Sequence, residues 1–111
     1  MGTAKYHGKS LEHWLAIRVS GGDDARLDAV NAIRQLCAPE ESVPQLVEAL
    51  EDHFWRVRAA AAHALYEMAQ DAAARPLVEA AWGKWERAVD DPSQEVRKGI
   101  LALMAVLERD G

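Results

Sequence analysis

The chain has 111 residues, of which half are apolar and 28% are charged, and its formal net charge at pH 7 is −5. These values are ordinary for one soluble globular domain and argue against intrinsic disorder. The acidic balance argues against nonspecific binding to nucleic acid or to an anionic membrane. The single cysteine, Cys37, excludes an intrachain disulfide.

The ends of the sequence carry no sign of targeting or of membrane insertion. The N-terminal residues lack the apolar segment that a signal peptide needs. The longest uncharged apolar stretch near the C-terminus, 99–107, is far too short to cross a bilayer. We therefore expect a cytoplasmic protein that does not contact membranes.

The spacing of apolar residues predicts two helices in the first part of the chain. The first follows Ser10, which can cap its N-terminus, and stops at the break formed by residues 20–23. The second covers 25–36, where small and aliphatic residues recur along one broad helical face. Pro39 and Pro44 bracket the next connection, and Pro44 suits the first turn of the third helix.

The later elements repeat this pattern. Windows 57–68 and 96–107 align with 25–36, and the second place in every window is an arginine: Arg26, Arg58 and Arg97. A further amphipathic stretch precedes each window. The sequence therefore predicts an all-α chain of about six helices in three hairpins, forming a single domain (1–111) with approximate repeats 8–37, 40–69 and 72–109.

The third copy carries an insertion within 82–88. Trp82, Trp85 and Val89 continue the i, i+3, i+7 spacing through it. We therefore expect the insertion to lengthen the first helix of this hairpin by about two turns.

The stretch 50–52, running into 57–65, resembles the HEAT repeat in its short bacterial form, and 91–97 resembles the turn and second-helix start of that family. The resemblance extends from about Gly8 to Leu107. It implies a right-handed α-solenoid whose second helices line a concave face, used mostly to bind other proteins.

The resemblance also implies a ladder of aspartate and arginine side chains between stacked repeats. Asp52 with Arg58 and Asp91 with Arg97 fit that pattern, whereas Ser20 stands at the acidic position of the first copy. We therefore expect Arg26 to be the arginine that lacks its usual acid.

Two sets of residues are candidates for contacting a partner. The family orientation places Asn31, His63 and Glu67 on the concave face, with Tyr66 beside them. The second set is aromatic: Phe54 and Trp55, which stand where the family turn has Asp-Pro, and Trp82 and Trp85 in the insertion. Alternatively, these aromatic side chains fold over the end of the hairpin and pack together.

Apolar residues cover most of the circumference of the last predicted helix. A terminal repeat normally turns a polar face to water. Four alternatives remain open for this surface, which includes Leu101, Leu103 and Val106: a homodimer interface, a docking site for a foreign partner, a contact within a longer array, or cover by the preceding helix.

No pattern points to catalysis, a cofactor or a metal. None of the four histidines has a metal-ligand spacing, and His63 with Glu67 would supply too few ligands for zinc. The leading interpretation is a non-catalytic adaptor or scaffold that binds a protein. The alternatives are a nucleic-acid-binding protein similar to the HEAT-like DNA glycosylases, or an accessory module of an enzyme system similar to the bilin lyases.

Overall fold

The structure is a computed structural model that describes residues 5–109. Most of the described chain is helical, and the only strands within it are two short ones at its start. The elements are β1 (Lys5–Tyr6), β2 (Lys9–Ser10), α1 (Leu11–Ser20), α2 (Asp23–Leu36), α3 (Pro39–Ala49), α4 (Trp55–Met68), α5 (Arg75–Ala80), α6 (Trp82–Trp85), the 3₁₀ helix η1 (Glu86–Asp90) and α7 (Gln94–Arg109).

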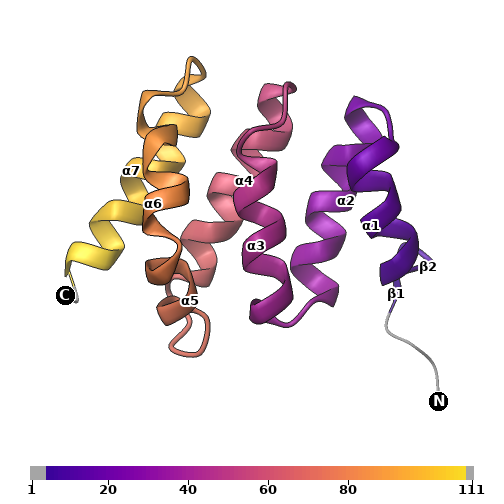
Figure 1. The fold of residues 1–111 in the computed structure, drawn as a ribbon, viewed down its shortest axis with the longest axis horizontal. Helices are drawn as coiled ribbons and strands as arrows, with labels where there is room; N and C mark the ends of the chain where they lie inside the picture. The colour runs from indigo at the N-terminus through magenta and orange to yellow at the C-terminus, as the bar shows by residue number, and fades with distance from the viewer. Residues whose placement is uncertain (1–4, 110–111) are drawn as a thin grey trace.

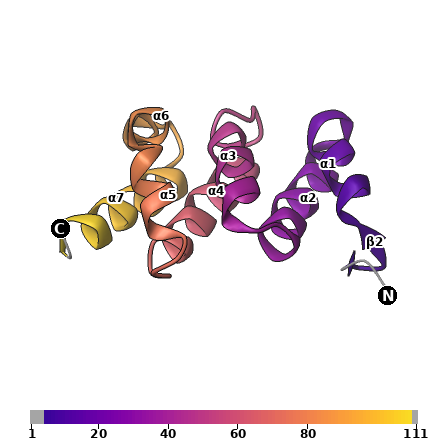
Figure 2. The same ribbon diagram turned by 60° about the horizontal axis from the view of Figure 1, so that its bottom comes forward.

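The helices form three hairpins that stack side by side in two layers. Helices α1, α3 and the α5–α6–η1 segment make up the first-helix layer, and α2, α4 and α7 make up the second-helix layer (Figures 1 and 2). The first and last described residues lie at opposite ends of the array (Figure 1). This arrangement confirms the expected all-α helical array, and we keep 8–37, 40–69 and 72–109 as working limits of repeats 1, 2 and 3.

The aligned windows of the sequence supply most of the core. Val57, Leu65, Val96, Ile100 and Leu103 have no exposed surface, and they join one apolar cluster that runs from α2 to α7. Each such side chain contributes about 1.5–3 kcal/mol when it leaves water. The apolar residues that recur at matching places in the aligned windows therefore pack the second helices against the first-helix layer and against each other.

A β-hairpin that the sequence reading did not anticipate covers the start of the array. Lys5 pairs with Ser10 and Tyr6 with Lys9, and His7 and Gly8 form the two-residue turn with positive φ angles of 52° and 75°. Positive φ at both turn residues matches the twist of a tight hairpin. Strands of two residues carry no detectable periodicity, so the sequence pattern could not reveal them.

The hairpin is held by an aromatic contact with the first helix. The indole Nε1 of Trp14 donates a hydrogen bond to the Tyr6 carbonyl at 3.0 Å, and the two rings pack edge to face with centroids 5.9 Å apart. Trp14 forms a second buried cluster with Ala29 and Ala32, against which Tyr6 also packs. The β-hairpin therefore closes the N-terminal edge of repeat 1.

The prediction of one lengthened helix in repeat 3 is wrong. Helix α5 stops at Ala80, and the chain continues as α6 and then η1. The physical reason lies in Trp85, which is completely buried and whose Nε1 donates to the Val78 carbonyl at 2.8 Å. A buried indole needs an acceptor, and the turn at Ala81 brings it back to one.

The expected position of Pro44 is also wrong. Helix α3 begins at Pro39, so Pro44 lies inside the helix, where its side chain is exposed. Pro39 is suited to a first helical turn, and Glu40 and Glu41 beside it favour the positive end of the helix dipole. The true helix start therefore combines a proline with two acids, a signal that outweighs the proline further along.

Helices α4 and α7 pack unusually close together at Gly99. A Cβ atom added at Gly99 would lie 2.9 Å from the Cβ of Ala62, closer than real Cβ contacts. Gly83 in α6, by contrast, has no atom within 4 Å of such a Cβ position. The close approach of α4 and α7 thus requires a residue without a side chain at position 99. Position 83 has room for a side chain.

These two glycines should respond to alanine with opposite signs. We expect Gly99→Ala to lower the free energy of unfolding by about 1 kcal/mol, because overpacking exceeds the gain in helix propensity. We expect Gly83→Ala to raise it by about 0.5–1 kcal/mol, because alanine only restricts the unfolded chain there. Urea denaturation of both variants tests this, and stabilisation by Gly99→Ala would contradict the close packing.

Candidate functional site

One arginine crosses the boundary between repeats 1 and 2. The Nε and Nη2 atoms of Arg26 donate to the two carboxylate oxygens of Asp52 at 2.8 and 2.9 Å, while its Nη1 donates to the Gly21 carbonyl at 2.8 Å. Asp23 accepts a further bond from Nη2 at 2.7 Å. Arg26 is therefore anchored in its own hairpin and reaches forward to the next.

The boundary between repeats 2 and 3 has the same geometry. Arg58 donates to both carboxylate oxygens of Asp91, at 2.9 and 3.2 Å, and its Nη1 donates to the Asp52 carbonyl at 2.8 Å. Each acid also holds its own turn, because Asp52 accepts the backbone N–H of Phe54 and Asp91 that of Ser93, both at 2.9 Å. The ladder therefore runs in one direction, from each arginine to the following repeat.

The expectation that Arg26 lacks an acid is wrong, because the arginine takes Asp52, the ladder acid of the following repeat, and Asp23 of its own helix, and needs no acid at position 20. Ser20 consequently accepts no hydrogen bond from Arg26. Of the three arginines that recur in the aligned windows, Arg97 is the one for which the described residues supply no carboxylate; its Nη1 donates to the carbonyls of Asp91 and Pro92 at 2.7 and 2.9 Å.

The Arg26 ladder position also shifts the pKa values of its acids. Burial acts to raise the pKa of Asp52, but the hydrogen bonds from Arg26 and from the Phe54 N–H outweigh it and lower that pKa. The bond from Arg26, aided by His53, lowers the pKa of Asp23, and the pKa of Arg26 is raised. All three groups therefore stay charged at neutral pH.

A groove lies on the second-helix face between α4 and α7. Its volume is about 390 Å³, and the residues that line it are Ala59, His63, Tyr66, Glu95, Lys98, Gly99 and Ala102. The small residues leave room in its middle, whereas Glu95 and Lys98 carry opposite charges on the α7 side. The imidazole and phenol rings of His63 and Tyr66 lie 6.2 Å apart.

Glu67 links this groove to the neighbouring second helix. Its carboxylate pairs with the guanidinium of Arg34 on α2, and its other oxygen lies 3.5 Å from Nε2 of His63. Tyr66 and Glu67 are half-buried, and His63 is exposed. The structure thus brings together His63, Tyr66 and Glu67 of the residues expected on this face. Asn31 lies half-buried on α2 and makes no hydrogen bond or ion pair with these three residues.

The four candidate aromatic residues separate into exposed and packed side chains. Trp55 and Trp82 are 41% and 40% exposed, and the guanidinium carbon of Arg56 lies 5.2 Å from the Trp55 ring centre. Phe54 is half-buried against the core, and Trp85 is fully buried, with its ring edge-to-face against Trp82 at 4.7 Å. Trp85 therefore cannot contact a partner, because its side chain has no exposed surface.

The last helix is largely covered by α4 of the preceding repeat and by η1 of its own. Leu103 has no exposed surface, so it cannot form the expected apolar interface, whereas Val106 is half-buried against the core. Arg75 on α5 donates to the carbonyls of Val106 and Leu107 at 3.2 and 3.1 Å, which satisfies the end of the helix. Leu101, at 53% exposure, is the one of the three predicted residues that faces water.

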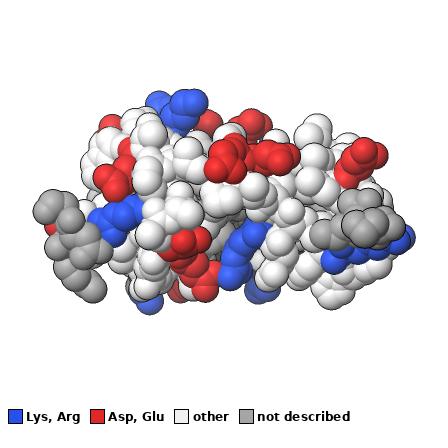
Figure 3. Space-filling view, turned by 90° about the horizontal axis from the view of Figure 1, so that it is seen from below, with Lys and Arg blue, Asp and Glu red and all other residues white. Residues whose placement is uncertain are grey.

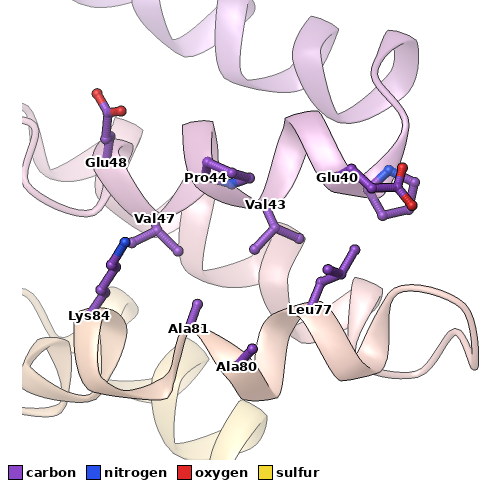
Figure 4. Close-up of a pocket in the computed structure, with 10 residues that line it drawn as sticks. Glu40, Val43, Pro44, Val47, Glu48, Leu77, Ala80, Ala81 and Lys84 are labelled. Atoms are coloured by element: carbon purple, nitrogen blue, oxygen red, sulfur yellow. The ribbon is translucent and has the colours of Figure 1, made fainter.

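A second groove, about 280 Å³ in volume, lies between α3 and the α5–α6 segment in the first-helix layer. In Figure 4, Val43 and Val47 of α3 face Leu77, Ala80 and Ala81 across it. Sequence reasoning did not predict this groove, because the family resemblance directed attention to the second-helix face and the aromatic residues. The signal was the pair of alanines opposite valines, which leaves the repeat boundary incompletely filled.

Charged side chains do not gather by sign on the face seen along the helix ends. Figure 3 shows acidic and basic groups interspersed there, with no continuous basic stripe. None of the helices between residues 5 and 109 is long and apolar enough to cross a membrane. The same residues contain no cluster of three potential metal ligands.

Cys37 shows no feature of a reactive thiol. Its side chain is half-buried, and burial, with the nearby Glu41 charge, raises its pKa. A thiol with a raised pKa is protonated at neutral pH and is a poor nucleophile. Cys37 therefore fits a packing role at the end of α2.

The family follows from comparison with known proteins. A family model of HEAT repeats matches residues 11–104, which include every hairpin of the array. The chain therefore belongs to the HEAT-repeat family. Searches of curated proteins and of solved structures returned no match.

The ladder predicts unequal costs for removing its arginines. We expect Arg26→Ala to lower the free energy of unfolding by about 2–3 kcal/mol, because it leaves the largely buried Asp52 carboxylate unpaired. Arg97→Ala should cost about 1 kcal/mol, since only hydrogen bonds to backbone carbonyls are lost. Urea denaturation measures both, and equal costs would show that the forward carboxylate adds no stability.

The lowered pKa of Asp52 predicts a pH dependence of stability. Its ion pair contributes fully above the unfolded pKa, about 4, and the contribution is lost as pH falls through the lower folded pKa. We expect Asp52→Asn to be less stable than the wild type at pH 7 and to lose less stability on going to pH 3. Thermal melts at both pH values test this, with the exposed neighbour Glu51→Gln as the control, which should follow the wild type.

Proposed function

We propose that this chain is a non-catalytic protein-interaction module that binds a partner segment in the groove between α4 and α7. The observation that carries the proposal is the groove itself, which has small residues in its middle and an aromatic and an imidazole side chain from α4 along it. HEAT repeats are commonly protein-interaction modules, and the groove lies on the second-helix face, where the resemblance to the family leads us to expect partner binding.

The lining of the groove defines the chemistry of a fitting segment. Ala59, Gly99 and Ala102 leave space for an apolar side chain, and the Tyr66 ring offers it an apolar surface. Glu95 and Lys98 present both signs of charge nearby. A helix or an extended peptide with a medium-sized apolar residue, flanked by charged or polar residues, fits these features.

The network around Glu67 supports binding by keeping one wall of the groove rigid. Because Arg34 holds the carboxylate of Glu67 from α2, the side chains of His63 and Glu67 lose little further freedom when a partner docks. Trp55 and Trp82, both partly exposed, remain candidates for additional anchoring at other sites.

The two alternative functions, nucleic-acid binding and an accessory role in an enzyme system, have less support than binding of a protein segment in the groove. The net charge of −5 and the mixed charges in Figure 3 do not favour a nucleic-acid surface. A role as accessory module of an enzyme system, such as a lyase, would use the same groove for its protein contact. We further propose that the module is cytoplasmic. We also propose that it self-associates through α7, independently of binding in the groove.

Blocking the groove should abolish peptide binding without unfolding the chain. The ligand source is a displayed library of random peptides, selected on the wild-type protein. We expect Ala102→Arg and Tyr66→Ala to weaken binding of the selected peptides at least about tenfold, an effect of about 1.4 kcal/mol. Isothermal titration measures the affinities, and circular dichroism checks that each variant is folded.

The matched control is Ala80→Arg, which adds the same side chain at an exposed site beside the opposite groove. It should leave peptide affinity unchanged. If Ala80→Arg weakens binding while Ala102→Arg does not, the binding site is the first-helix groove and the proposal fails.

A further inference from the structure

Leu101 occupies a position that the two earlier repeats bury. The sixth residues of the three aligned windows are Val30, Ala62 and Leu101. Val30 belongs to the core cluster shared with α3 and α4, and Ala62 faces Gly99 of α7 at close range. Leu101 is instead 53% exposed, because no described element lies beyond α7 at this end of the array (Figure 1).

Arg97 repeats this contrast in its hydrogen bonding. Its Nη1 bonds to the Asp91 carbonyl at 2.7 Å, as the Nη1 of Arg58 bonds to the Asp52 carbonyl at 2.8 Å. In Arg58 this anchoring directs Nε and Nη2 across the repeat boundary to a carboxylate. In Arg97 both hydrogen bonds, to the carbonyls of Asp91 and Pro92, come from Nη1, so the same edge of the guanidinium is available for a carboxylate that lies outside the described chain.

The opposite end of the array does not supply that carboxylate. Ser20 stands where Asp52 and Asp91 stand in the later repeats, and the β-hairpin packs over the first repeat through Tyr6 and Trp14. A head-to-tail stack of identical chains would therefore meet a covered edge without a ladder acid. The charge pattern favours a different pairing.

The outer edge of α7 is complementary to itself. Arg97, Leu101, Met104 and Glu108 follow the spacing i, i+4, i+7, i+11, which confines them to about 60° of the helix circumference at about 100° per residue. In an antiparallel pair of such helices, Arg97 of each copy faces Glu108 of the other, and Leu101 faces Met104. Glu108 is exposed and Met104 is half-buried, so both can take part.

We propose that two copies of this chain associate through an antiparallel α7–α7 contact, in which Leu101 and Met104 form the apolar centre and Arg97 and Glu108 form reciprocal ion pairs. This inference rests on the self-association included in the proposed function and adds its register. A contact of this kind is isologous and closes at two copies. Because one helix from each copy forms it, the dimer should dissociate on dilution.

The test is solution mass by light scattering after size exclusion, over a hundredfold concentration range. We expect the wild type to shift from monomer to dimer within that range. Leu101→Glu should raise the dimer dissociation constant by about tenfold or more, because it places two carboxylates in an apolar contact. The control Val19→Glu alters an apolar residue on α1 that is even more exposed, at 76%, and should dimerise like the wild type.

The register is tested by reversing charge. Glu108→Arg and Arg97→Glu should each dimerise poorly alone, since like charges then face each other, and an equimolar mixture should recover a heterodimer. A wild type that is monomeric throughout overturns the self-association itself. A dimer that resists Leu101→Glu, or that the charge mixture does not recover, overturns the register while leaving self-association standing.

Discussion

At each boundary in this array, an arginine is held from behind by a carbonyl of its own hairpin and bonds forward to an aspartate of the next. The arrangement fixes both the distance and the angle between neighbours, because a bidentate guanidinium–carboxylate pair tolerates little displacement. Asp52 and Asp91 add a second constraint, since each also accepts the backbone N–H two residues further on. Stacking and turn formation therefore depend on the same carboxylate. This spacing sets the width of the grooves on both faces of the array. It also determines how closely Gly99 approaches Ala62.

The distribution of filled and unfilled space follows from side-chain size at these boundaries. Large aliphatic residues complete the core, and Trp85 reaches into it from an irregular segment. Where alanine and glycine lie at the boundary, the layers do not close completely, which produces the groove beside His63 and the one beside Val43. Binding surfaces in this chain thus arise from small residues between rigidly spaced helices, and they need no flexible loop.

The sequence predicts the parts of this structure that depend on periodicity, and it fails where one distant contact decides. Helical spacing identified the second helices, and the family orientation placed His63 on their concave face with Tyr66 beside it. The same spacing continues through Trp82 and Trp85, so it could not show that α5 ends at Ala80; the hydrogen bond from Trp85 to the Val78 carbonyl determines that. The acid partner of Arg26 escapes prediction for a similar reason. Spacing within one repeat is the same whether an arginine pairs with its own acid or with the next, and only the bonds from Arg26 to both oxygens of Asp52 reveal the direction.

The placement of the tryptophans has a spectroscopic consequence. Trp14 is buried under the β-hairpin at one end of the array, and Trp85 is buried beside Val78 near the other, with both indole N–H groups bonded to backbone carbonyls. Repeats in such an array interact mainly with their neighbours, so the two ends can open separately. Opening at either end would hydrate a different indole and shift its emission to longer wavelength. Intrinsic fluorescence of single-tryptophan variants can therefore follow the two ends of the molecule as independent signals.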